Sequence, residues 1–226
     1  MKRALWFSLV VILAWWAYAV ARQLLATPSP KDVQEILLHV CVKAAGFALV
    51  VTVLLRAAGE RLGDLGFRLP TAREALVIGA PLTLALFVVS NVVLNSALAS
   101  ILGGGSSRSI AHLFRDPAQA PLWVLTAVIG GGFAEELERA FILTRFEKLF
   151  GRAGLIAALT LSTIVFGLGH LYQGPAGAIS AGFTDLAMAF VYLRRRRVMD
   201  AMLVHAAFDL LGIAAAYALY GRGVTH

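Results

Sequence analysis

Long apolar segments dominate this chain of 226 residues and restrict its fold more than any other feature. Seven can be read from the sequence, at 4–25, 36–55, 75–102, 122–146, 155–172, 177–193 and 198–220. Each is long enough, or nearly so, to cross about 30 Å of hydrocarbon as an α-helix. Lipid offers the backbone no hydrogen-bond partner, so spans of this kind must be helical. The sequence therefore predicts an all-α, polytopic membrane helix bundle with about seven transmembrane helices (six to eight).

The composition excludes the main soluble classes. Hydrophobic residues make up 59% of the chain and charged residues only 15%, whereas soluble domains carry about 25% charged residues. A soluble domain of this length could not bury so much apolar surface. The single cysteine, Cys41, cannot form an internal disulfide. We expect one integral membrane domain over residues 1–226, with two spans in residues 1–60.

The positive charges indicate how the chain lies in the membrane. The net charge is +7, and the densest basic run, Arg194–Arg197, adjoins an apolar segment. Membrane orientation explains this placement better than nucleic-acid binding does, so no nucleic-acid partner is expected. With the N-terminus in the cytoplasm, thirteen Lys and Arg residues lie inside and five outside. The alternative that residues 4–25 form a cleaved signal peptide is disfavoured, because the apolar run continues past Ala21 to Leu25.

Ionisable residues inside the fourth segment call for an explanation. Residues 130–139 read GGGFAEELER, and each ionisable group at mid-bilayer costs about 2.5–3.5 kcal/mol. These side chains must face the bundle interior or a water-filled cavity. Glu135 and Arg139, four residues apart, share a helix face and can pair, with Glu138 near the same face and Glu136 about 100° away. A structural ion-pair cluster is the alternative to a catalytic one.

The apolar segments 155–172 and 198–220 each contain a histidine. His170 ends one apolar segment, and His205 and Asp209 lie four residues apart in the last. Asp209 is predicted to accept a hydrogen bond from one ring nitrogen of His205. By position, His170 lies toward the outer end of its span and His205 toward the inner end of the other, so they converge if the fifth helix is tilted or shifted, or if the cavity is tall. Asp185, in the segment between them, is interpreted as structural.

Carboxylates and imidazoles together can activate water. One route is general-base catalysis by a glutamate. The other is a zinc ion, for which His170, His205 and Glu135 are the candidate ligands. The chain has no HExxH sequence, which excludes a standard zincin site.

Three motifs in order resemble the CPBP (CAAX protease and bacteriocin-processing) family of intramembrane endopeptidases. They are Glu135-Glu136-x-x-Arg139, Phe166-x-x-x-His170 and His205-x-x-x-Asp209. The resemblance covers roughly residues 64–211, the expected protease core, and includes the DLGFR stretch that starts at Asp64. The commoner family spacing is EExxxR, and here it is EExxR. The division of the roles of water-activating base and arginine partner between Glu135 and Glu136 is therefore open.

The resemblance implies an enzyme that hydrolyses peptide bonds of a membrane-associated protein or peptide, in CAAX-type or leader-peptide processing. Glu135, Glu136, His170, His205 and Asp209 would be catalytic, with Arg139 as an ion-pair partner, and a zinc cofactor is possible. The alternatives are a non-catalytic partner-binding protein, such as a bacteriocin self-immunity protein, and an ion or solute carrier. The expected location is a prokaryotic plasma membrane, with the N-terminus cytoplasmic.

Overall fold

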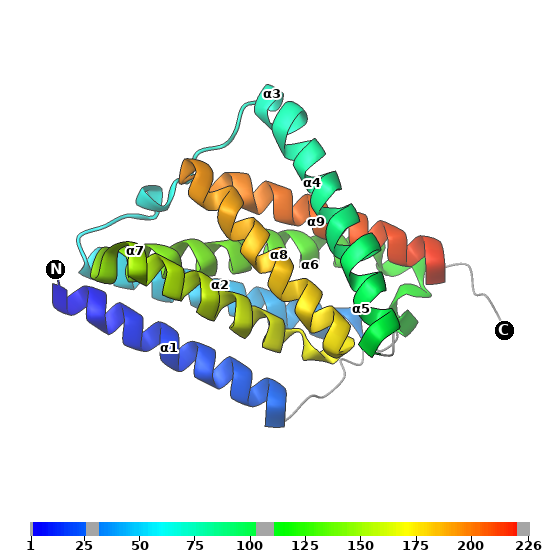
Figure 1. Ribbon diagram of the computed structural model, residues 1–226, viewed down its shortest axis with the longest axis horizontal. Coiled ribbons are helices and arrows are strands. Elements are labelled where there is room, and N and C mark those ends of the chain that lie inside the picture. The colour runs from blue at the N-terminus through cyan, green and yellow to red at the C-terminus, as the bar shows by residue number, and fades with distance from the viewer. Residues whose placement is uncertain (1, 26–31, 103–110, 221–226) are drawn as a thin grey trace.

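The computed structural model describes the chain except for residues 1, 26–31, 103–110 and 221–226. In the described ranges every regular element is a helix, which confirms the predicted all-α fold (Figure 1). The long helices are α1 (Lys2–Leu25), α2 (Val33–Ala57), α7 (Glu136–Gly169), α8 (Gly174–Arg195) and α9 (Val198–Tyr220).

Two further spans alternate α-helix and π-helix without a break. One contains α3 (Ala72–Glu74), η2 (Ala75–Gly79), α4 (Ala80–Phe87), η3 (Val88–Leu94) and α5 (Asn95–Leu102). The other contains α6 (Ala120–Thr126) and η6 (Ala127–Glu135), which continues directly into α7. Short 3₁₀ turns are η1 (Leu62–Leu65), η4 (Ala111–Phe114), η5 (Pro117–Gln119) and η7 (Leu171–Gln173).

Six helical stretches of the described chain are long and apolar enough to cross a membrane. The fourth of them, Pro117–Gly169, has 53 residues, about 80 Å at 1.5 Å per residue, and is too long for one crossing. It is broken at Gly151, where φ is 62° and ψ is −144°, and Figure 1 shows α7 doubling back there. The two arms are the fourth and fifth segments predicted from the sequence, so the structure agrees with about seven spans.

Local signals set several helix ends. Asp32 caps α2, since its carboxylate accepts a hydrogen bond from the Glu35 backbone N–H at 2.7 Å. Gly59, at φ 77°, follows the end of α2. Arg196, at φ 54°, ends α8 in the left-handed conformation and makes the tight turn into α9. The basic run Arg194–Arg197, which the sequence predicts to be a charged hinge between the last two spans, therefore ends α8 and turns at Arg196 and Arg197. The segment 103–108 (GGGSSR), which the sequence predicts to be a flexible loop, lies outside the described residues.

The core surrounds α7. Phe141, Ile142 and Leu143 are fully buried, and Ile12 and Trp16 of α1 pack into the same cluster. The helix α7 packs along both α1 and α8. Because the N-terminal span contributes to this core, it is an integral part of the described bundle.

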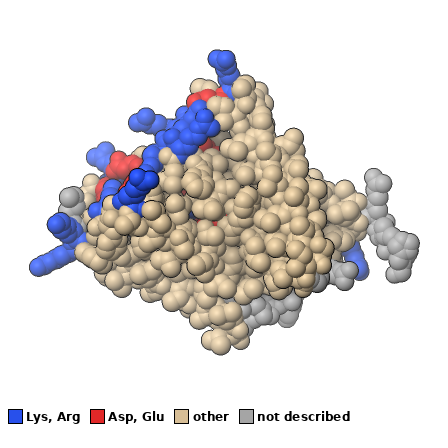
Figure 2. Space-filling model, viewed as in Figure 1, with Lys and Arg blue, Asp and Glu red and all other residues tan. Residues whose placement is uncertain are grey.

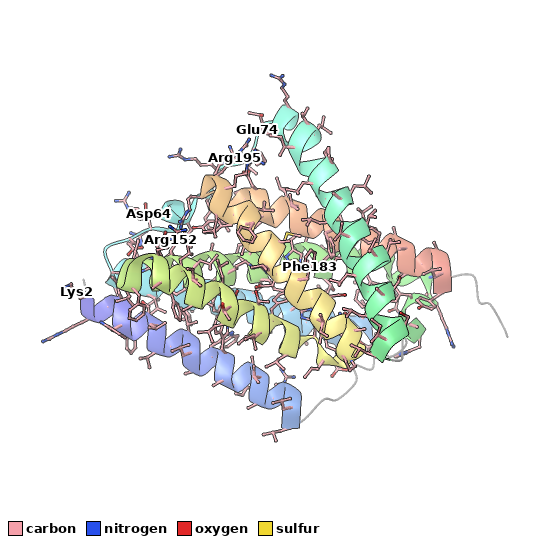
Figure 3. All side chains as sticks on the ribbon, viewed as in Figure 1. Lys2, Asp64, Glu74, Arg152, Phe183 and Arg195 are labelled. Atoms are coloured by element: carbon pink, nitrogen blue, oxygen red, sulfur yellow. The ribbon has the colours of Figure 1, made fainter. Side chains whose placement is uncertain are left out.

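Charged side chains gather along one edge of the molecule. Figure 2 shows Lys and Arg concentrated there, while the rest of the visible face is largely uncharged. Figure 3 places Lys2, Asp64, Glu74, Arg152 and Arg195 along this edge. We call it the basic edge, and it holds the helix ends and turns at residues 2–3, 56–74, 147–152 and 194–197. Such a segregation of charge is what the positive-inside count from the sequence requires.

Candidate active site

A widened helix turn beside α9 forms the floor of the candidate site. Residues Ala127–Glu135 are π-helical, a conformation frequent at functional sites. A Cβ on Gly131 would collide with the Asp209 carboxylate and would lie 3.2 Å from His205 Nε2. A Cβ on Gly132 would lie 2.9 Å from the Ala206 Cβ. The glycines therefore let α9 approach η6 closely enough to bring His205 and Asp209 to the start of α7.

Glu136 is the centre of a buried polar network. Its side chain is 1% exposed and pairs with the guanidinium of Arg139, which is itself buried. The same carboxylate accepts a hydrogen bond from His205 Nδ1 at 2.5 Å. Of the two arginine partners that the sequence left open, the structure therefore pairs Arg139 with Glu136 and not with Glu135. The partner stands at i+3 rather than i+4, because the chain changes from π-helix to α-helix between the two glutamates.

Asp185 of α8 completes the surroundings of the arginine. Arg139 Nε donates to Asp185 at 2.8 Å, and Ser162 Oγ donates to the other carboxylate oxygen at 2.8 Å. A buried guanidinium with a carboxylate on either side is well compensated for the loss of water. Asp185 thus has the structural position expected of it, and it links α8 to both arms of α7.

Glu135 and Asp209 stand on the other side of His205. His205 Nε2 lies 3.8 Å from a carboxylate oxygen of Glu135 and 3.8 Å from one of Asp209. Both distances are too long for a direct hydrogen bond, so the predicted hydrogen bond between His205 and Asp209 is wrong. Asp209 is therefore too far from Nε2 to hold the His205 ring directly. The ring is held at Nδ1, by Glu136. The Glu135 side chain is 24% exposed, so it is more open than the buried Glu136.

His170 contacts Phe166, which in turn lies beside His205. Its Nδ1 donates to the Phe166 backbone carbonyl at 2.8 Å, and its ring stacks on the Phe166 ring at 4.5 Å. The Phe166 ring is in turn 6.4 Å from the His205 ring and 5.5 Å from the Arg139 guanidinium. Both imidazoles therefore lie beside one phenyl ring, although their positions in the sequence place them toward opposite ends of their spans. The Nδ1–H of His170 is committed to the carbonyl, which leaves Nε2 as its basic nitrogen in the neutral ring.

Glu138 does not belong to this group, although the sequence placed it near the face of Glu135. Its carboxylate accepts a hydrogen bond from Trp16 Nε1 at 2.7 Å and lies 4.0 Å from Lys43 Nζ. It therefore joins α7 to α1 and α2. Sequence reasoning also missed Phe166 as the ring shared by both histidines and Ser162 as a partner of Asp185. Only the three successive glycines gave a local signal for the close approach of α9.

The donor set does not fit a metal ion in this arrangement. Among the described residues, no three His, Cys, Asp or Glu side chains are grouped closely enough to hold one. The predicted trio His170, His205 and Glu135 is not among such groups. The Nδ1 of each imidazole is engaged, by the Phe166 carbonyl and by Glu136, which leaves Nε2 as the nitrogen that could bind a metal.

Residues 117–211 match the family model described as "Type II CAAX prenyl endopeptidase Rce1-like". The resemblance to the CPBP family is therefore confirmed over residues 117–211, where the chain is similar to the Rce1-like proteins. This family indicates a protease embedded in a membrane, with a membrane-associated peptide or protein as substrate. No curated protein and no solved structure gave a significant match.

Proposed function

We propose that the chain is an intramembrane endopeptidase in which Glu135 activates the attacking water. This proposal is supported by the different burial and different partners of the two glutamates. Glu136 is buried and bound to Arg139 and His205, whereas Glu135 is partly exposed and lies 3.8 Å from His205 Nε2. A polar gap of that length suits a bridging water. Glu136 is then a positioning residue that holds His205 by its Nδ1–H.

The reaction follows from these positions. Glu135 takes a proton from the water, and the water oxygen forms a bond to the carbonyl carbon of the substrate. The negative charge that develops on the carbonyl oxygen is stabilised by the Nε2–H of a protonated His170 or His205, because the Nδ1–H of each ring is already given to the Phe166 carbonyl or to Glu136. The C–N bond then breaks as Glu135 returns the proton to the leaving amine. Asp209, 3.8 Å from His205 Nε2, helps to hold the water.

The test is cleavage of a farnesylated CAAX reporter peptide by the full chain in lipid vesicles. Because a positioned general base contributes about 10²–10⁴-fold, we expect Glu135→Gln to lower kcat at least 100-fold with little change in KM. Glu136→Gln, His170→Ala and His205→Ala should also lose most activity. The matched control is Glu138→Gln, on the same helix but bound to Trp16, which should stay within threefold of wild type.

Retained cleavage in Glu135→Gln would contradict the assignment of the base. A wild type that cleaves no prenylated or leader peptide, yet binds one unchanged after both glutamates are replaced, would favour the non-catalytic alternative. The zinc alternative is decided by the metal content of purified wild type and of a His170→Ala/His205→Ala double variant. Stoichiometric zinc in the wild type that is lost in the double variant would favour the zinc mechanism over the glutamate-only mechanism.

We also propose that the basic edge faces the cytoplasm of a prokaryotic cell, with the N-terminus on that side. Cysteine labelling in intact cells tests this, starting from a Cys41→Ser background. Arg68→Cys and Arg152→Cys should be shielded from a membrane-impermeant thiol reagent, while Ala118→Cys, at the opposite end of the bundle, should react. The reverse pattern would invert the orientation.

A further inference from the structure

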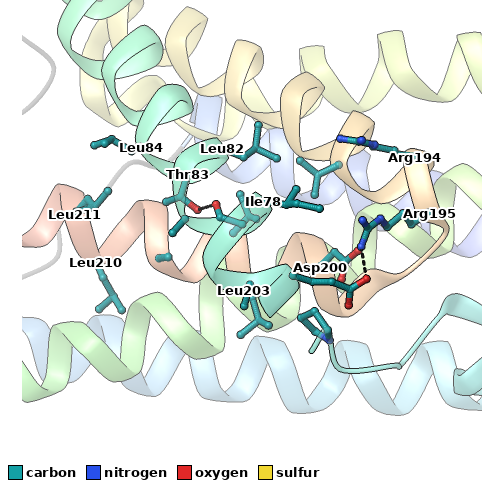
Figure 4. Close-up of a pocket in the computed structure, with 18 residues that line it drawn as sticks. Ile78, Leu82, Thr83, Leu84, Arg194, Arg195, Asp200, Leu203, Leu210 and Leu211 are labelled. Atoms are coloured by element: carbon teal, nitrogen blue, oxygen red, sulfur yellow. Dashed lines mark hydrogen bonds and ion pairs between the residues drawn. The ribbon is translucent and has the colours of Figure 1, made fainter. Parts of the chain in front are cut away.

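A recessed apolar cavity lies beside the candidate active site but is separate from it. Its volume is about 600 Å³, and Figure 4 shows Ile78 and Leu82 of the third span facing Leu203, Leu210 and Leu211 of α9. On α9 the lining runs from Asp200 to Leu211, about 16 Å at 1.5 Å per residue. An apolar hollow of this length suits a hydrocarbon chain.

One end of this cavity is charged, and the acids Glu74 and Asp200 line it together with two arginines. Arg194 and Arg195 stand there, at the α8–α9 turn (Figure 4). Arg195 also lines a second, polar pocket of about 340 Å³. The other residues of this arginine pocket are Gly63, Asp64, Gly66, Arg68, Arg196 and Arg197.

The arginine pocket is built by close packing of two backbone segments far apart in sequence. Gly66 has φ 84°, and a Cβ there would collide with the backbone of Arg196 and Arg197. The loop after α2 is therefore pressed against the α8–α9 turn. The contact fixes the walls of the pocket at the basic edge.

The charges around the two cavities do not cancel. Glu74 pairs with Arg195 and Arg197, Asp200 with Arg197, and Glu147 with Arg196. In the part of the chain that the structure describes, Arg68 and Arg194 have no carboxylate partner, and the only acid in the arginine pocket itself is Asp64. An anion is thus the complementary ligand for the polar end, as for basic pockets between membrane helices.

We propose that the two cavities together bind one anionic phospholipid, with its phosphate in the arginine pocket and an acyl chain in the apolar cavity. The shared Arg195 joins the polar part to the apolar part. The apolar wall is one face of α9, while His205 and Asp209 lie on the face that meets η6. The bound lipid therefore supports the helix that carries part of the candidate site. Binding itself does not depend on the proposed peptidase activity.

Native mass spectrometry of the full chain, with dioleoyl phosphatidylglycerol or dioleoyl phosphatidylcholine added, tests the proposal. The two lipids share their chains and differ in headgroup charge. We expect at least tenfold tighter binding of phosphatidylglycerol, and a rise in unfolding temperature that the zwitterionic lipid does not match. The double variant Arg68→Gln/Arg194→Gln should lose that preference. These two substitutions break none of the ion pairs described above.

The matched control is Arg152→Gln, an exposed arginine of the same edge that lines neither cavity, and it should keep the preference. Ile78→Trp, which fills the apolar cavity, should weaken phosphatidylglycerol binding at least tenfold. Equal binding of the two lipids, or an unchanged preference in the double variant, would overturn the headgroup site. Undiminished binding to Ile78→Trp would overturn the acyl-chain site. If a farnesylated peptide raises the unfolding temperature and neither lipid does, the lipid proposal is overturned and both cavities are assigned to the peptide substrate.

Discussion

At the scale of single residues, the site depends on which partner each charged group finds inside the bundle. Arg139 could reach Glu135 at i+4 or Glu136 at i+3, and the structure selects Glu136. In the pair that forms, Asp185 binds Arg139 and His205 binds Glu136. Glu135 is thereby left outside the buried ion pair, with a side chain that is 24% exposed. Two adjacent glutamates of identical chemistry acquire different surroundings purely from their direction on the helix.

Gly131 gives the sharpest test at this scale. In Gly131→Ala the new methyl group would displace the Asp209 carboxylate and press on His205 Nε2, so we expect cleavage of the reporter peptide to fall at least tenfold. The matched variant is Gly130→Ala, whose Cβ would meet only the Val40 side chain, at 3.2 and 3.6 Å. It should retain most activity. Equal losses in the two variants would show that the glycines serve helix packing in general rather than the site.

At the scale of elements, the π-helix η6 and the reversal in α7 do most to bring the motifs together. The π-helix sets the direction of Glu135 and Glu136, and the reversal at Gly151 returns the chain so that Phe166 and His170 reach the same region. The segments and the turn were predictable from hydropathy and from the glycines. The π-helical turn was not, because no composition signal separates it from an α-helix.

Gly151→Ala tests the reversal. The glycine has φ 62° and ψ −144°, a region almost closed to residues with a Cβ, and occupying it costs about 1–3 kcal/mol. We expect the variant to unfold at a temperature several degrees below wild type in the same detergent. Gly46→Ala in α2 is the control, since a Cβ there meets nothing within 4 Å. Its unfolding temperature should be unchanged or slightly raised. A Gly151→Ala protein as stable as this control would contradict a tight turn at residue 151.

At the scale of the whole molecule, ion pairs at the basic edge connect loops to spans. Glu60, in the loop after α2, binds the fully buried Arg145 and also Lys148 at 2.7 Å. The Arg145 guanidinium also lies 4.9 Å from the centre of the Phe141 ring. This loop carries two glycines of the arginine pocket, so Glu60 helps to hold that pocket in place.

The Glu60 contacts predict a pH dependence of stability. Burial alone would raise the pKa of this carboxyl, but hydrogen bonds from Arg145 and Lys148 outweigh it and hold the pKa below its usual value of 4.5. A lowered pKa in the folded state means that the stabilisation is complete above pH 4.5 and is lost as the pH falls through the lowered value.

Thermal unfolding of wild type and Glu60→Gln between pH 7 and pH 3 measures this effect. The variant should be less stable at pH 7, because Arg145 loses its charged partner, and the difference should shrink in acid as Glu60 of the wild type is protonated. A difference that stays constant down to pH 3 would show that Glu60 does not titrate in this range.

The sequence by itself determined the class of fold and the residues that carry the chemistry. Apolar length requires membrane helices, and the cost of ionisable groups in lipid requires that Glu135, Glu136, His170, His205 and Asp209 have a reason to be there. The choice of partners was decided only by the tertiary structure. Spacing along one helix offers several pairings of similar energy, whereas the choice among them depends on what other helices bring, here Asp185 from α8 and His205 from α9. The lipid cavity likewise exists only where α4, α8 and α9 meet.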